Sequence, residues 1–95
     1  MKPKLDQEIW HLGYSKDCRY LEKMRVGFLG TRGFICYEQL QMYPISYSCY
    51  GSTWFLEKED AVKWLEENGY ELKDDLYWDM KGCIYVKKGE RNEIH

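Results

Sequence analysis

The sequence predicts a small α+β domain: a small antiparallel β-sheet or SH3-like half-open barrel of about five to six strands, with one helix near residues 57–68. A chain of 95 residues supports one hydrophobic core, so we expect a single domain over residues 1–95. Sixteen aromatic residues against a single alanine favour pleated strands over a helical bundle. Residues 1–7 and 89–95 are polar, and we expect both ends to be flexible.

Alternating apolar residues predict the first three strands. The first covers Glu8–Tyr14. The clearest hairpin follows, because the runs Tyr20–Leu29 and Phe34–Glu38 flank a short glycine-bounded turn at 30–33. Side chains alternate between the two faces of a strand, so we expect one face of the second strand to carry Met24, Val26 and Phe28.

The segments after this hairpin are less regular. Residues 39–44 are predicted to be irregular, because Pro44 has no N–H to donate to a sheet. Residues 45–50 and 53–55 are expected to form a fourth strand that is interrupted at Gly51 and Ser52. After the helix we expect an acidic connection over 71–75, and then a second hairpin that pairs residues 76–79 with 83–87.

The helix near residues 57–68 has a start, an apolar face and a stop. Ala61, Trp64 and Leu65 follow the i, i+3, i+4 spacing of one helical face. Carboxylates at the start suit the positive end of the helix dipole. They belong to Glu57, Glu59 and Asp60. Asn68 followed by Gly69 predicts the end, because glycine readily adopts the left-handed conformation.

The cysteines and the hydropathy favour a reduced, cytoplasmic protein. The four cysteines form no Cys-x-x-Cys pair, and two histidines are too few to complete a zinc site. They are Cys18, Cys36, Cys49 and Cys83. No apolar run resembles a signal peptide or a membrane span. We therefore expect reduced thiols, no metal, no cofactor and no membrane partner.

Enzymatic chemistry receives little support. The 30–33 segment lacks the glycine spacing of a phosphate loop, and no helix follows it. Cys49 and His11 could pair as nucleophile and base, but nothing in the sequence brings them together. Asp74, Asp75 and Asp79 lack the spacing of a calcium loop. We therefore expect no catalytic residues and a protein that is not an enzyme.

Negative charge is concentrated in one block. Residues 57–79 contain nine acidic and three basic residues, although the formal net charge of the whole chain is −2. Such carboxylates could imitate the phosphates of a nucleic acid and occupy a basic groove on a partner. The alternative is an ordinary solvated helix face. The candidate partner-binding residues are Glu57, Glu59, Asp60, Glu66, Glu67, Glu71, Asp74 and Asp75.

Two motifs carry a resemblance that covers residues 8–66. The first is Arg25-Val26-Gly27-Phe28-Leu29-Gly30-x-x-x-Phe34-Ile35, and the second is Thr53-Trp54-Phe55-x-x-x-Glu59-x-Ala61. Together they resemble small uncharacterised proteins of phages and prophages of Gram-positive bacteria. The resemblance implies an origin on a mobile element and an anti-CRISPR-like role in the host cytoplasm. The expected partner is then a host protein with a basic surface, such as a nuclease effector.

Two other classes remain open. A single-stranded nucleic-acid binder would use the basic residues near the first hairpin together with strand tyrosines as stacking surfaces. Its candidate residues are Lys23, Arg25 and Arg32. The net acidic charge disfavours it, so we expect no direct nucleic-acid contact. A homo-oligomeric structural protein, such as a homodimer, would bury the aromatic surplus between copies.

Overall fold

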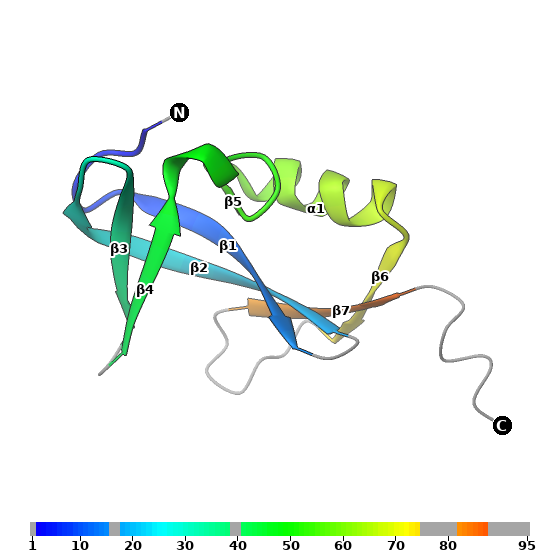
Figure 1. Ribbon diagram of the computed structural model, residues 1–95. Coiled ribbons are helices and arrows are strands. Elements are labelled where there is room, and N and C mark those ends of the chain that lie inside the picture. Colours follow the sequence, from blue (N-terminus) through cyan, green and yellow to red (C-terminus); the bar gives the residue numbers. More distant parts are fainter. Residues whose placement is uncertain (1, 16–17, 39–40, 75–81, 88–95) are drawn as a thin grey trace, which may run out of the picture.

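The computed structural model describes residues 2–15, 18–38, 41–74 and 82–87, and it forms a curled antiparallel sheet with an α-helix against it (Figure 1). This confirms the predicted fold class. Seven strands are described. The elements in chain order are β1 (Glu8–Ser15), β2 (Cys18–Leu29), β3 (Gly33–Glu38), β4 (Gln41–Ser46), the 3₁₀ helix η1 (Tyr47–Cys49), β5 (Trp54–Phe55), α1 (Lys58–Glu67), β6 (Tyr70–Asp74) and β7 (Gly82–Lys87).

The long strand β2 organises the sheet. One edge of β2 pairs with β1 along residues 18–25. The other edge is shared, because residues 18–22 pair with β7 and residues 26–29 pair with β3. The sheet therefore forks into two arms, β7 with β6 and β3 with β4, which lie at opposite ends of β2 in Figure 1.

The two arms enclose two separate cores. We call the side with β3, β4 and η1 the hairpin lobe, and the side with α1, β6 and β7 the helical lobe. The hairpin-lobe core contains Ile9, Met24, Val26, Phe34, Cys36, Ile45 and Trp54. The helical-lobe core contains Leu12, Leu21, Phe55, Ala61, Leu65, Tyr70, Cys83 and Tyr85. The paired strands β1 and β2 form a ribbon that both cores share. Odd- and even-numbered residues of each strand enter different cores, so the two cores lie on opposite faces of this β1–β2 ribbon.

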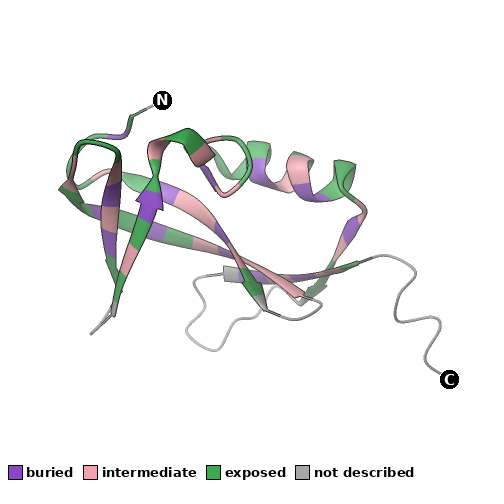
Figure 2. Cartoon of the chain, in the orientation of Figure 1, coloured by how far each residue is buried: buried purple, intermediate pink, exposed green. Residues whose placement is uncertain are grey.

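The helix α1 follows its sequence pattern closely. Ala61 and Leu65 are fully buried against the sheet, and the opposite face is exposed (Figure 2). The side-chain amide of Asn68 donates a hydrogen bond to the carbonyl oxygen of Trp64 at 2.8 Å. Gly69 then adopts a φ of 86°, which a residue with a Cβ rarely does. The predicted apolar stripe and the predicted stop are both confirmed.

The expectation for Phe28 was wrong because a β-bulge interrupts β2. Val26 pairs with Cys36, but Phe28 pairs with Ile35, so the register shifts by one residue at Gly27. Met24 and Val26 share one face as expected and are buried in the same core, whereas Phe28 is 53% exposed. An extra residue reverses the alternation of faces, which moves Phe28 to the outer face of the sheet.

Three predicted segments need correction. Residues 41–46 form β4, although residues 39–44 were predicted to be irregular; pairing opposite Ile35 requires no N–H from Pro44. Residues 47–49 form η1 instead of continuing a strand, and a side-chain oxygen of Ser46 accepts a hydrogen bond from the Ser48 N–H. Residues 70–74 form β6 and pair with β7, where an acidic connection was expected. Residues 76–79, the predicted partner of β7, lie outside the described residues.

Candidate functional site

Six of the eight predicted acidic residues can be placed on the helical lobe. Glu57, the N-cap of α1, is exposed, and so are Glu59 and Asp60 in its first turn. Glu66 and Glu67 are exposed in its last turn. Glu71 follows on β6 and is half-buried. We call these six residues the acidic surface. The side chain of Asp74 and the whole of Asp75 lie outside the described residues.

The exposed carboxylates of α1 and of its N-cap have no basic ion-pair partner among the residues that the structure describes. Within the described part of the chain, none of the five carboxylates from residue 57 to residue 67 forms an ion pair. Helix geometry separates these acids from the buried stripe, so they face solvent. The Nζ of Lys58 lies 5.5 Å from the ring centre of Trp10, which directs this charge toward β1. Lys63 remains on the outer face as the basic member of the helix surface.

A pocket of about 400 Å³ lies where α1 meets β6 and brings two predicted acids together. Glu66 and Glu71 line it with Leu72 and the rings of Tyr70 and Tyr85. Burial, followed by the charges of Cys83 and Glu66, raises the pKa of Tyr85 above its usual value. The phenol therefore stays protonated and neutral beside the carboxylates. The apolar lining was not predicted, because residues 71–75 were expected to form a connection. The signal that identifies a strand is the alternation of apolar and charged residues that begins at Tyr70.

One arginine fixes the aromatic side chains beside this pocket. The guanidinium carbon of Arg19 lies 5.1 Å from the ring centre of Trp64, 5.5 Å from that of Tyr14 and 5.9 Å from that of Tyr70. Its Nε donates a hydrogen bond to the carbonyl oxygen of Gly13 at 3.1 Å. Cation–π contacts of this kind stabilise ring positions. Trp64 and Tyr70, which lie next to the acidic surface, are therefore held in place by Arg19.

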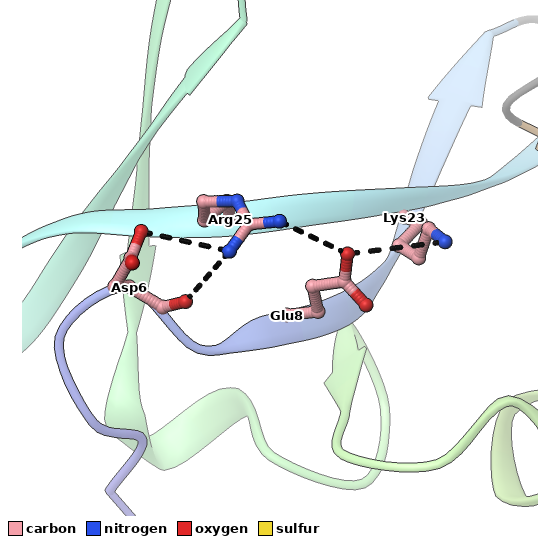
Figure 3. A network of polar contacts seen from close by, with 4 residues as sticks. All are labelled: Asp6, Glu8, Lys23 and Arg25. Carbon is pink, nitrogen blue, oxygen red and sulfur yellow. Dashed lines mark hydrogen bonds and ion pairs between the residues drawn. The ribbon is translucent and has the colours of Figure 1, made fainter.

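The basic residues proposed for nucleic-acid contact do not form one free surface. Arg25 donates to Glu8 at 3.2 Å and to the carbonyl oxygen of Asp6 at 3.1 Å (Figure 3). Lys23 forms an ion pair with the same Glu8 carboxylate at 3.9 Å. Arg32 is separate, at the tip of the turn between β2 and β3, and its side chain is exposed. Two of the three charges are therefore already paired within the chain.

The imidazole and the thiols offer no assembled catalytic group among the described residues. His11 is largely buried and its Nδ1 has no hydrogen-bond partner. Burial, together with the charge of Arg19, lowers the pKa of His11 to about 4, so the ring is neutral at pH 7. All four cysteines are free, and burial raises the pKa of Cys36 to about 11. A protonated buried thiol is a weak nucleophile. The described residues contain no group of three or more potential metal ligands.

The comparisons with known proteins give no match. The chain was compared with protein-family models, with curated proteins and with solved structures, and none of them matches it. Among the described helices, none has the length and apolar character needed to cross a membrane.

Proposed function

We propose that this protein is a non-enzymatic binding module that uses the acidic surface to bind a basic surface on a partner protein. One observation carries the proposal: four carboxylates on α1 and that of its N-cap, Glu57, are exposed and form no ion pair within the described chain. Elsewhere in the same chain, Asp6 and Glu8 are paired with Arg25. The carboxylates of the helix are thus available to a partner protein, whereas those near the amino terminus are paired within the chain.

Unpaired carboxylates on one helix act over distance. Their summed potential accelerates the encounter with a positively charged surface and disfavours acidic partners. Their spread along α1 resembles a row of phosphates, so the proposed partner surface is one that normally holds nucleic acid. Such binding weakens as ionic strength rises, because exposed charges are screened over about 8 Å at physiological salt.

The resemblance to phage and prophage proteins narrows the proposal. It supports an inhibitor of a host defence protein or of a nucleic-acid-handling protein, with an anti-CRISPR-like action, in the host cytoplasm. A nuclease effector is one such partner, because its nucleic-acid channel is basic. Direct nucleic-acid binding has less support, because Lys23 and Arg25 already hold internal carboxylates.

The proposal is tested by affinity capture from a Gram-positive bacterial lysate with mass spectrometry of the retained proteins. The variant to compare carries Glu59→Gln, Glu66→Gln and Glu67→Gln, which removes three exposed charges from α1. We expect the unchanged protein to retain a basic protein and the variant to lose it. Retention should also decline steeply between low and physiological salt.

A charge-matched control separates local binding from net charge. Leu5→Lys, Thr31→Lys and Ser48→Lys change exposed positions away from α1 and shift the net charge by the same three units. This control should still retain the partner. If the α1 variant captures the same proteins as the unchanged chain, or if the control loses them equally, the acidic surface is not the binding surface.

A further inference from the structure

The outer face of the hairpin lobe carries a shallow apolar groove of about 460 Å³. Its apolar walls come from Phe28 on β2, Ile35 on β3 and Pro44 on β4, and Arg32 also lines it. Continuing along the same face, Tyr37 pairs with Met42, and these side chains are 48% and 62% exposed. The volume falls within the range of about 300–1,000 Å³ that is typical of binding pockets.

The β-bulge in β2 creates this groove. Without the extra residue at Gly27, Phe28 would continue the buried row of Met24 and Val26. With it, Phe28 stands beside Ile35 on the outer face. The ring of Tyr37 covers Gly27 so closely that a Cβ there would collide with it. The exposed apolar surface thus comes from a defined backbone device, and bulges commonly redirect a side chain in this way.

Arg32 gives the groove a charge. Among the residues that line it, Arg32 alone is a basic or acidic residue. Its backbone is fixed, because its carbonyl oxygen accepts a hydrogen bond from the Tyr47 N–H at 3.0 Å. The Tyr47 hydroxyl also donates to the carbonyl oxygen of Gly30 at 2.8 Å. The guanidinium of Arg32 has no carboxylate partner among the described residues, in contrast to that of Arg25.

The sheet edge beside the groove is poorly suited to adding a strand. Pro44 has no N–H, so Ile35 and Pro44 form a non-hydrogen-bonded pair of the antiparallel ladder. In such a pair the backbone groups of each residue point away from the partner strand. The missing donor lies on the free edge of β4. The Ser46 carbonyl oxygen already accepts a hydrogen bond from Trp54 Nε1 at 3.1 Å. An occupant therefore lies across the side chains of the face instead of pairing along the edge.

From these observations we propose that the groove docks an apolar segment of a partner protein that carries a carboxylate, with Phe28 as the apolar contact and Arg32 as the anion contact. Charge complementarity selects this occupant, because an apolar groove with a single unpaired guanidinium matches an apolar segment with a single acid. The site lies on the lobe away from the acidic surface and is independent of the function proposed above.

The probe is the peptide acetyl-Leu-Phe-Asp-Leu-Leu-amide, with a matched control in which asparagine replaces the aspartate. Binding to the full chain is followed by amide chemical shifts in NMR titrations up to about 1 mM peptide. We expect the aspartate peptide to shift the amides of Phe28, Arg32 and Ser46, and the asparagine peptide to bind about three- to fivefold more weakly. Arg32→Glu should weaken the aspartate peptide about tenfold, and Phe28→Gln should weaken both peptides.

Two control variants lie on the helical lobe. Leu72→Gln removes an apolar side chain that is 51% exposed, and Lys63→Glu reverses an exposed positive charge. Both should leave the affinity for the peptide unchanged. Equal affinity for the two peptides, unchanged binding by Phe28→Gln, or no shifts at the highest concentration would each overturn the proposal. Shifts that arise from protein concentration alone, with a doubled mass, would assign the face to a second copy.

Discussion

The two lobes share β1 and β2 but use their aromatic residues differently. In the hairpin lobe the rings are inside: Trp54 meets Phe34 edge-on at 4.9 Å and Tyr50 at 4.8 Å. In the helical lobe the half-buried Trp64 stacks on the buried Tyr70, and the guanidinium of Arg19 lies over both rings. The hairpin lobe therefore packs ring against ring, and the helical lobe adds cation–π contacts to its ring stacking.

The lobes also differ in what they leave unsatisfied. Among the described residues, the helical lobe exposes carboxylates without ion-pair partners, whereas the hairpin lobe exposes apolar side chains beside Arg32, which forms no ion pair. Each lobe therefore presents a different chemistry on a common framework. The comparison predicts that damage to the framework affects both lobes, and that changes to either surface stay local.

The largest effect is expected for Trp54→Ala. Trp54 is fully buried and its Nε1 donates to the carbonyl oxygen of Ser46, so truncation leaves a cavity and an unpaired acceptor. The free energy of unfolding should fall by about 3–5 kcal/mol. Urea unfolding followed by circular dichroism measures this loss. Trp10→Ala, at a half-buried position beside the other core, should cost less; an equal cost would show that the two lobes do not differ in packing.

A second comparison uses one glycine from the hairpin lobe and one from β1, which the two lobes share. A Cβ at Gly33 would collide with the carbonyl oxygen of Ile45 and lie 3.1 Å from the Ser46 Cα, so Gly33→Ala must push the β3–β4 backbones apart. We expect a loss of about 2–3 kcal/mol. A Cβ at Gly13 would meet only the Tyr20 side chain at 3.7 Å and its carbonyl oxygen at 3.8 Å, both ordinary contacts. Gly13→Ala should therefore be neutral or slightly stabilising in thermal unfolding. The reverse ranking would contradict the strand spacing described for the hairpin lobe.

Acid should weaken the ribbon that joins the lobes. The pKa of His11 is about 4 in the folded chain and near 6.5 when unfolded, so only the unfolded chain binds this proton between those values. Stability from His11 is therefore complete above about pH 6.5 and declines as pH falls toward 4. Near pH 5 the loss should be about 2 kcal/mol.

Urea unfolding across this pH range provides the measurement. His11→Gln cannot titrate, so its stability should change less between pH 7.5 and pH 5 than that of the unchanged chain. An identical pH dependence in both proteins would mean that His11 is accessible to protons in the folded state.

The smallest effect is expected at the start of α1. Glu57 occupies the N-cap but its side chain makes no capping hydrogen bond. Aspartate is a favoured N-cap residue, so Glu57→Asp should stabilise the chain by about 0.5–1 kcal/mol without changing its charge. A rise in melting temperature measures the gain. Glu57→Gln serves as the control and should give no comparable rise; a fall for Glu57→Asp would mean that the long side chain contributes by another route.

The sequence predicts those elements whose pattern is local. The helix is identified by the spacing of Ala61 and Leu65 and by Gly69, and the first hairpin by its alternating runs. The outer position of Phe28 could not be predicted, because a bulge is decided by the packing of Tyr37 over Gly27. Strand β6 was missed because its charged residues alternate with Tyr70 and Leu72, and the pairing with β7 decides the outcome.

The candidate site was predictable to a similar degree. The acidic residues were identified from composition, because charge runs on a helix face are readable without coordinates. What determines their availability is the absence or presence of a neighbouring base. For Lys58, the basic residue between Glu57 and Glu59, this depends on its position over Trp10, a contact between residues far apart in the chain.

The shared edge of β2 has a consequence for how this chain can change over evolutionary time. A deletion of one residue between Cys18 and Val26 would reverse the orientation of every side chain on one side of the gap. Leu21 and Met24 could then no longer both be buried, each in its own core. Point substitutions at the exposed positions of either lobe avoid this constraint, so new binding specificities are expected to arise by replacement and not by insertion within this strand.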